Sequence, residues 1–203
     1  YVCAECGHPS CLFAGTIFQD CKSDLYKLLL GIFIFFTANK GVSAMEMRSQ
    51  LDVNYKTALL LCRKCRVIMA ECNSTTILNT MFYEADVAYI GSKSKEPGHQ
   101  GYGTQQKPFF IALSTLQDNK YPQSIKLKVI SKDDSFTTKD FLSKVLVLSK
   151  DKVLNTDGKS TFNIMKDKIH VINERIDYSE CNHRLYWLNI IAGNIKNTIA
   201  GIY

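Results

Sequence analysis

The hydrophobic pattern changes once along this chain, close to Asn73, and this change limits the fold more than any other feature of the sequence. Before Asn73, apolar residues in the run 55–71 recur at spacings of three and four, which is typical of one face of a helix. After Asn73, β-branched and aromatic residues alternate with other residues, as they do in half-buried strands. We therefore expect a helical N-terminal part followed by a larger α/β domain.

The N-terminal part is predicted to contain three helices, at 24–38, 43–50 and 55–71. Asn54 is a suitable N-cap for the third of them. A short helix, a turn and a longer helix match the helix-turn-helix layout, in which the second helix presents its first residues to the major groove. Those residues would be Asn54, Tyr55, Lys56 and Thr57. Many three-helix domains share this outline, so a plain helical subdomain is the alternative.

Composition indicates the compartment and the kind of partner to expect. The most apolar stretch, LLLGIFIFF at 28–36, is much shorter than the roughly 18–20 residues that cross a bilayer, so we expect a buried helix and no membrane partner. Several of the eight cysteines lie in close pairs instead of at regular intervals, which favours a reducing, cytoplasmic compartment. A net charge of +6 permits a nucleic-acid partner without requiring one.

The part after Asn73 is predicted to run strand, strand, strand, helix, strand, short helix, strand and long helix. The expected ranges are 82–90, 109–115, 124–131, 137–148, 152–155, 160–165, 169–173 and 185–200. This order, βββαβαβα, is that of ribonuclease-H-like domains, so we expect an α/β (α+β) fold of that class over 80–203. The long loop 91–107 holds Lys93 and Lys95, which are candidate DNA contacts; an ordinary solvated loop is the alternative.

Two aspartates occupy positions where this fold order carries acidic residues. Asp86 lies inside the first predicted strand, where Asp is disfavoured, and Asp157 follows the fourth strand, before Gly158. On the last helix, Asn189 and Lys196 are seven residues apart, which is about two turns and therefore nearly one face. Each feature has an ordinary alternative: a solvent-facing Asp86, a simple Asp-Gly turn, and a solvated helix face.

Several separated segments together resemble one family. They read KGVSAMEM at 40–47, VNYKTA at 53–58, EADVAYIG at 84–91, NTDG at 155–158 and WLNIIAGNIK at 187–196, with GIY at the end. In this order they are similar to the DDE transposases of ISXO-type insertion sequences, relatives of the Merlin elements. The resemblance runs from about Tyr1 to the last residue, and motifs in the right order are more specific than any one of them.

The resemblance implies a zinc ribbon, here 1–21, then a helix-turn-helix at 22–73 and a catalytic domain at 80–203. Cys3 and Cys6 resemble the second Cys-x-x-Cys of the ribbon. A structural zinc site needs four ligands, so Zn²⁺ would require a further pair upstream of Tyr1. Because the sequence does not begin with Met, we expect it to start inside a longer product. Cys62 and Cys65 are expected to be small buried helix residues without a metal.

The resemblance also implies a reaction. Such a transposase hydrolyses a phosphodiester at the element's end to leave a 3′-OH, which then attacks target DNA; two Mg²⁺ (or Mn²⁺) ions serve both steps. By resemblance, Asp86 would bridge both ions, Asp157 would hold one and Asn189 the other, while Lys196 would contact the phosphate or terminal base. The expected partner is double-stranded DNA, as terminal inverted repeats and target. A homodimer or larger assembly, associated with the nucleoid, is implied.

The chain departs from the family pattern in several places. Most of the wider superfamily has Glu where this chain has Asn189, so the second ion should bind more weakly. Val87 replaces an acidic residue, Ser92 replaces a common Gly, and the chain ends at Tyr203, where the family continues with His. A fragment or divergent copy is therefore expected. The alternatives are a non-catalytic DNA-binding protein derived from a transposase, and a ribonuclease-H-like nuclease.

Overall fold

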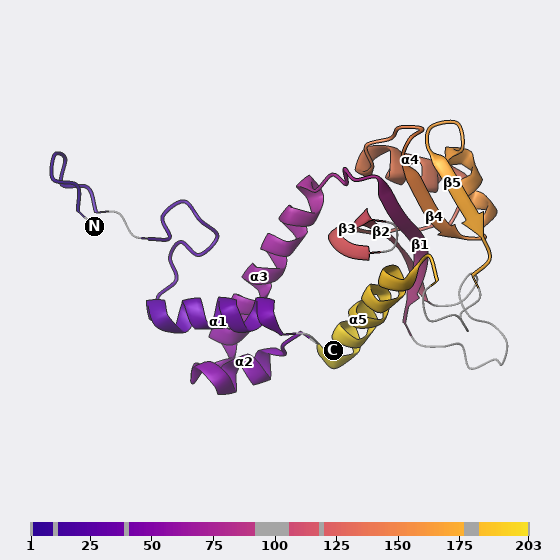
Figure 1. Cartoon of the computed structure of the whole chain (residues 1–203). Helices are drawn as coiled ribbons and strands as arrows, with labels where there is room; N and C mark the ends of the chain where they lie inside the picture. Colours follow the sequence, from indigo (N-terminus) through magenta and orange to yellow (C-terminus); the bar gives the residue numbers. More distant parts are fainter. Residues whose placement is uncertain are drawn as a thin grey trace. The chain divides into compact units, whose positions relative to one another are not determined.

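The computed structural model describes residues 2–9, 12–38, 41–91, 106–117, 120–176 and 183–202. The chain divides into two compact units, one formed by Tyr1–Glu71 with Thr198–Tyr203 and the other by Cys72–Asn197 (Figure 1). Over the described ranges, no helix combines the length and apolar character needed to cross a membrane. Lys93 and Lys95 of the predicted loop 91–107 lie outside the described residues.

The first unit contains the three predicted helices: α1 (Leu25–Thr37), α2 (Ala44–Leu51) and α3 (Tyr55–Thr75), which extends four residues beyond its expected end. Side chains cap their first turns. Ser43 Oγ accepts the Glu46 N–H at 3.1 Å, and Asn54 Oδ1 accepts the Thr57 N–H at 2.9 Å, so the prediction that Asn54 is an N-cap is confirmed. Such a cap stabilises a helix by about 1 kcal/mol.

The apolar core of this unit explains the glycine within the LLLGIFIFF stretch. A Cβ added at Gly31 of α1 would lie 2.4 Å from Leu61 Cδ2 and 2.8 Å from Leu51 Cδ1, so this helix approaches its neighbours closely. Cys62 and Cys65 of α3 are fully buried in the same core, as expected, and burial raises the pKa of the Cys65 thiol to about 11.

The second unit contains β1 (Phe82–Ile90), β2 (Lys107–Gln117), β3 (Lys120–Val129), α4 (Ser135–Val145), β4 (Val153–Asp157), η1 (Ser160–Met165), β5 (His170–Glu174) and α5 (Tyr186–Ile202). The predicted order of elements is confirmed. The main differences are longer second and third strands, a 3-10 helix in place of the short α-helix, and an α4 that ends three residues early, where Leu146 is extended.

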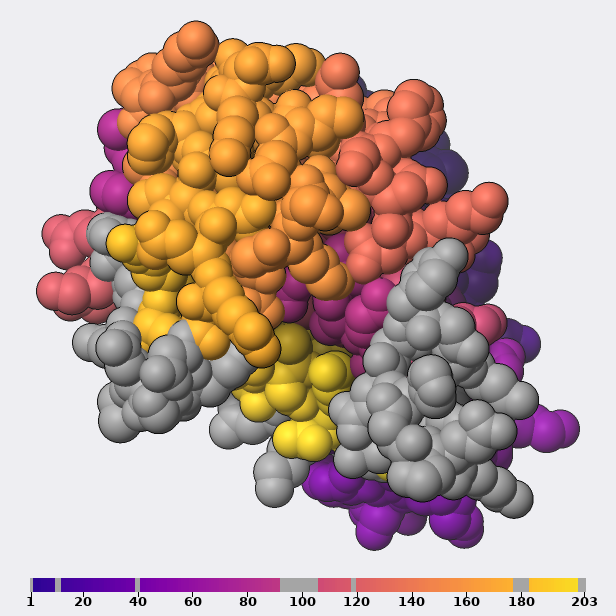
Figure 2. Space-filling view, turned by 90° about the vertical axis from the view of Figure 1, so that its right-hand side faces the viewer, coloured from indigo at the N-terminus to yellow at the C-terminus, as the bar shows by residue number. Residues whose placement is uncertain are grey.

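These strands form one five-stranded mixed sheet in the order β3-β2-β1-β4-β5. The first three strands pair antiparallel, whereas β4 is parallel to β1 and β5 is parallel to β4. The architecture is mixed α/β and is compatible with a ribonuclease-H-like fold. In Figure 2 the orange surface is formed by the segment from α4 to β5.

The two faces of the sheet have different cores. On one face, Tyr83 and Val87 of β1 pack with Phe110 of β2, Phe141 of α4 and residues of η1, and the rings of Phe110 and Phe141 stack 4.9 Å apart. On the other face, Ala88 packs with Leu185 and Leu188 from around the start of α5. Because successive strand residues alternate between faces, Glu84 and Asp86 lie on the α5 face together with Ala88.

Asn73, where the hydrophobic pattern changes, is fixed to the edge strand β3. Its side-chain amide donates to Leu127 O at 3.0 Å, and its Oδ1 accepts the Leu127 N–H at 2.9 Å. The buried Lys126 ammonium donates to the carbonyl oxygens of Asn73, Ser74 and Thr76 around the end of α3. A cation at a helix C-terminus is favourable, and the Asn73 amide covers part of an otherwise open sheet edge.

Candidate active site

Asp86 occupies the middle of β1, and its carboxyl group is mostly withdrawn from water. Burial raises the pKa of Asp86 to about 6; the Lys159 ammonium and the Val87 backbone N–H oppose this rise, while the charges of Asp157 and Asp133 add to it. The alternative of a solvent-facing Asp86 is therefore wrong. The charges of two other carboxylates and one ammonium therefore act on Asp86.

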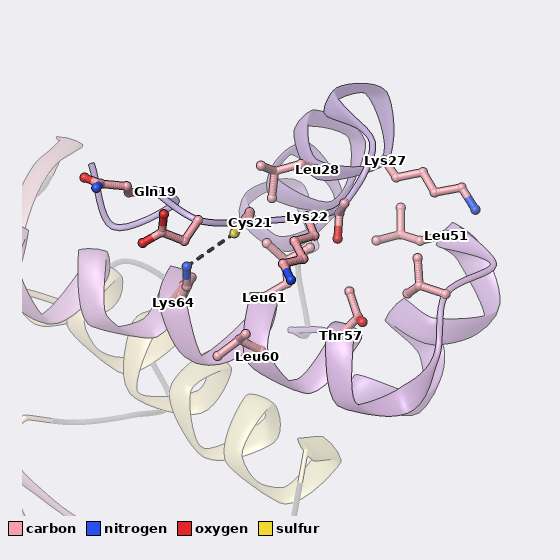
Figure 3. A pocket seen from close by; sticks show the side chains of 13 residues that line it. Gln19, Cys21, Lys22, Lys27, Leu28, Leu51, Thr57, Leu60, Leu61 and Lys64 are labelled. Carbon is pink, nitrogen blue, oxygen red and sulfur yellow. Dashed lines mark hydrogen bonds between the residues drawn. The ribbon is translucent and has the colours of Figure 1, made fainter. Parts of the chain in front are cut away.

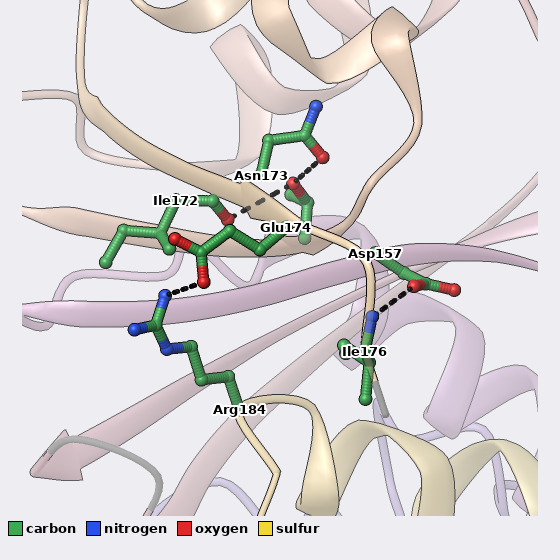
Figure 4. A network of polar contacts seen from close by, with 7 residues as sticks. Asp157, Ile172, Asn173, Glu174, Ile176 and Arg184 are labelled. Carbon is green, nitrogen blue, oxygen red and sulfur yellow. Dashed lines mark hydrogen bonds and ion pairs between the residues drawn. The ribbon is translucent and has the colours of Figure 1, made fainter. Parts of the chain in front are cut away.

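Asp157 is the last residue of β4 and lies beside Asp86. The parallel pairing of β1 with β4 ends at Glu84 and Asn155, and Asp86 and Asp157 each follow two residues later, on the same face of the sheet. Oδ1 of Asp157 accepts the Ile176 N–H at 3.4 Å (Figure 4). The structure thus brings together the two aspartates that the sequence singled out.

The turn after Asp157 requires glycine. Gly158 has φ +61°, and a Cβ there would lie 3.3 Å from the Arg175 backbone. The Asp-Gly sequence is therefore a turn, as the alternative interpretation held, and at the same time it sets the Asp157 carboxylate beside Asp86. The two interpretations do not exclude each other.

Asp133 and Lys159 are site residues that the sequence alone did not reveal. Asp133, in the connection between β3 and α4, has a side chain only 9% exposed, and its Oδ2 accepts the Lys159 ammonium at 3.0 Å and the Tyr89 hydroxyl at 3.1 Å. In the sequence, Asp133 precedes Asp134, which caps α4, so the pair resembles a helix start. The sequence feature that could have pointed to Lys159 is its position directly after the Asp157-Gly158 turn.

Glu84 joins β1 to the first turn of α5. Its side chain is almost fully buried, and Oε2 accepts the Leu188 N–H at 2.9 Å. The N–H groups of a helix's first turn have no partner within the helix, so a carboxylate there is strongly favourable. No local pattern in the sequence indicated this contact with α5, 104 residues away.

Asn189 follows Leu188 on the turn that Glu84 fixes. Its Nδ2 atom is buried and has no hydrogen-bond partner among the described residues. Asn189 flanks the buried face of α5, whose members include Leu188 and Ala192. Lys196, two turns further along, is exposed.

The oxygen atoms of this site are of the kind that Mg²⁺ and Mn²⁺ prefer. Asp86 and Asp157 supply two neighbouring carboxylates, and the amide oxygen of the half-buried Asn189 would add a neutral ligand. Within the described ranges, no three His, Cys, Asp or Glu side chains gather closely enough to hold one metal ion. The residues therefore fit a divalent cation that keeps several water ligands, as Mg²⁺ usually does.

Cys3 and Cys6 lie on an exposed loop at the start of the chain. The Cys3 N–H donates to His8 O at 3.0 Å, and the Gly7 N–H donates to Cys3 O at 2.9 Å. Hydrogen bonds from the backbone of Cys6, and then of Glu5, lower the pKa of the Cys3 thiol. A lowered thiol pKa suits a metal ligand, since the thiolate is the binding form.

The residues expected to contact DNA begin α3. Tyr55 is 44% exposed and Lys56 is exposed, whereas Asn54 and Thr57 bond to each other through the Thr57 hydroxyl at 3.1 Å. Further along α3, Leu60, Arg63 and Val67 are also exposed, and with Lys56 they recur at spacings of four, three and four. One face of α3 therefore presents two cations and two apolar side chains to solvent.

The first unit also contains a cavity of about 510 Å³ between the segment 19–23, α1, the end of α2 and α3 (Figure 3). Leucines line it together with three lysines, Lys22, Lys27 and Lys64. Two of the ammonium groups are engaged: Lys64 contacts Cys21 Sγ at 3.3 Å, and Lys27 donates to Asp52 O at 2.8 Å. None of the predicted catalytic residues lines this cavity.

Comparison with known proteins gives only weak likenesses. No known family matches the chain, and no curated protein matches it. It is similar to a pre-cleavage Mos1 transpososome, with a TM-score of 0.25, 9% identity, and 72% of this chain and 58% of that chain covered. It is also similar to the Mos1 strand transfer complex, with a TM-score of 0.26, 9% identity, and coverage of 85% and 72%.

The chain thus spans less than two thirds of the first of these structures. TM-scores of this size do not establish a shared fold. The function is therefore inferred from the residues of the site.

Proposed function

We propose that this chain is a DNA transposase that cuts and joins DNA by metal-dependent, in-line phosphoryl transfer. One observation carries the proposal: the Asp86 and Asp157 carboxylates lie two residues beyond the paired part of adjacent parallel strands, and the charge of Asp157 acts on the largely desolvated Asp86. Holding two like charges together in a partly dry site is costly unless a cation joins them. The resemblance of the surrounding motifs to ISXO-type transposases supports the same conclusion.

Asp86 and Asp157 would hold the cation, and Asn189 would add its amide oxygen. A bound divalent ion polarises a phosphoryl oxygen and lowers the pKa of a bound water. In the cleavage step, water oxygen bonds to phosphorus, the bond from phosphorus to O3′ breaks, and O3′ takes a proton. In the joining step, the oxygen of this 3′-hydroxyl bonds to a target phosphorus, the bond from that phosphorus to the target O3′ breaks, and the departing O3′ takes the proton that the attacking hydroxyl loses. Lys196, exposed on α5, would contact the DNA phosphate.

The helices α2 and α3 would bind the terminal inverted repeats as a helix-turn-helix. Asp52, between them, has φ +48°, and Val53 packs on the core, so the connection is a short, fixed turn. Tyr55 and Lys56 are exposed at the start of α3 and would reach the major groove. The side-chain oxygen of Asn54 already accepts the Thr57 N–H as an N-cap, so Asn54 would act mainly by stabilising the first turn of α3.

The proposal also includes a zinc site, an assembly of several chains and two further DNA contacts. Cys3 and Cys6 would form one half of a zinc ribbon whose remaining two ligands come from elsewhere. Joining two DNA ends implies a homodimer or a larger assembly on double-stranded DNA. Lys93 and Lys95, outside the described residues, remain predicted DNA contacts.

Replacing the two aspartates tests the catalytic assignment. We expect Asp86→Asn and Asp157→Asn each to lower Mn²⁺-dependent nicking of an end-containing duplex by about 1,000-fold, corresponding to roughly 4 kcal/mol of lost transition-state stabilisation. Calorimetry should show weaker Mn²⁺ binding by both variants. Asp167→Asn, which changes an exposed aspartate between η1 and β5, is the matched control and should behave as wild type. Nicking that survives both changes would contradict the assignment.

A non-catalytic DNA-binding protein is the second candidate, and the neutral Asn189 on α5 favours it. It predicts normal DNA binding without Mn²⁺-dependent nicking in the wild type. A nuclease on the same fold would cut DNA without joining it. Gel analysis of the products separates the three possibilities, because only a transposase yields joined DNA.

A further inference from the structure

The turn that carries Lys159 is fixed on both sides by one residue of β5. Oδ1 of the Asn173 side chain (labelled in Figure 4) accepts the Thr156 hydroxyl at 2.8 Å, and its Nδ2 donates to Lys159 O at 2.8 Å. Gly158 lies between them with its positive φ. The backbone of Lys159 therefore has little freedom.

The Lys159 side chain is held as firmly. Its ammonium donates to Asp133 Oδ2 at 3.0 Å and lies 5.6 Å from the centre of the Tyr89 ring. The Tyr89 hydroxyl donates to the same Asp133 oxygen. Tyr89 lies three residues after Asp86 on β1, and the ammonium is close enough to Asp86 to act on its charge. The ammonium is thus held two residues after Asp157, where its charge acts on Asp86.

Stability alone gives little reason for this arrangement. An ion pair with a buried carboxylate gains little net free energy, because desolvation offsets the attraction. Moreover, Oδ1 of Asp133 is buried and makes no hydrogen bond within the part of the chain that the structure describes. The Lys159 side chain, in contrast, is still 35% exposed. Two of its three ammonium N–H donors have no partner among the described residues and can meet a ligand from solvent.

The charges of this site match one divalent cation. The formal charges of Asp86, Asp157 and Asp133 sum to −3 and that of Lys159 is +1, which leaves −2. Glu84 is left out of this count because its carboxylate is engaged by the first turn of α5. Two divalent ions would leave an excess of two positive charges before DNA binds. Asn189 is neutral and adds no charge to hold a second ion.

We propose that Lys159 is a catalytic residue that holds a non-bridging oxygen of the scissile phosphate, in the place that a second metal ion would take. Asp133 and Tyr89 are positioning residues that orient its ammonium. The chain then binds one divalent cation, between Asp86 and Asp157. This inference rests on the proposed transposase function and specifies its metal content and its phosphate contact.

The first test counts metal ions and phosphate contacts. We expect calorimetry and Mn²⁺ electron paramagnetic resonance to give one Mn²⁺ per wild-type chain, and one also for Lys159→Met. With Ca²⁺, which supports binding without chemistry, Lys159→Met should lower the slope of log affinity for duplex DNA against log salt by about 0.9, the value for one phosphate contact. Lys166→Met, at an exposed lysine after η1, should leave the slope unchanged.

The second test follows the reaction. We expect Lys159→Met to lower Mn²⁺-dependent nicking by about 100-fold, the usual loss for one transition-state donor, and Lys159→Arg to restore part of it. Asp133→Asn should lower nicking less, and adding it to Lys159→Met should cause little further loss, because both act through one ammonium. Thermal unfolding of each variant shows that it is folded.

The possible failures are distinguishable. Two Mn²⁺ per wild-type chain, or a Lys159→Met variant with unchanged nicking and salt slope, overturns the role of Lys159 while the transposase function stands. Independent losses from Lys159→Met and Asp133→Asn overturn the positioning role of Asp133. A wild-type chain that neither binds Mn²⁺ nor nicks DNA overturns this inference together with the proposed function.

Discussion

The Asp86 carboxyl group loses most of its contact with water when the chain folds, and this loss sets how the stability of the free protein depends on pH. Its pKa rises from an ordinary 3.8 to about 6. Below about pH 4 the group is protonated in both states. Between about 4 and 6 the unfolded chain ionises first and binds fewer protons, so stability falls as pH rises and stays lowered above 6.

Asp86→Asn should therefore stabilise the metal-free protein. At pH 7 in EDTA we expect a gain of about 2 kcal/mol in the free energy of unfolding, measured with urea, and no gain below about pH 4. Asp167→Asn, at an exposed position, should show no such pH dependence. A gain that is the same at every pH would contradict the proposed origin in the buried charge. With Mn²⁺ added, the wild type should have the higher free energy of unfolding, because only the wild type keeps both carboxylates.

At the scale of elements, the helix α5 is attached to the sheet by one buried carboxylate. Glu84→Ala leaves the Leu188 N–H without its partner in a buried place, and a charged hydrogen bond of this kind contributes about 2–3 kcal/mol. We expect that loss in urea unfolding for Glu84→Ala, and less than half of it for Glu84→Gln, which keeps an acceptor oxygen. Equal losses in both variants would show that the hydrogen bond is not the cause.

At the scale of the whole molecule, the net charge of +6 matters less than where the cations lie. If α3 reads DNA, Lys56→Ala and Arg63→Ala should each weaken binding and lower the salt slope by about 0.9. Lys139→Ala changes an exposed lysine on α4 and should change neither quantity. Fluorescence anisotropy with an end-containing duplex measures both. An unchanged slope in both α3 variants would exclude this face of the helix as the DNA contact.

The sequence by itself determined the order and type of the elements and the two aspartates on β1 and β4. These features are local: periodicity marks each element, and an Asp inside an apolar strand is conspicuous because strands disfavour it. The cap at Asn54 was predictable for the same reason, since its partner is three residues away.

Only the tertiary structure decided which other groups join the site. Asp133 meets Tyr89 across 44 residues and Lys159 across 26, and Glu84 meets the start of α5 across 104. Each residue taken alone resembles an ordinary cap, turn or surface residue. The contacts arise because β1 and β4 are neighbours in the sheet although far apart in the chain, and because burial then makes each charge depend on a partner that the fold supplies.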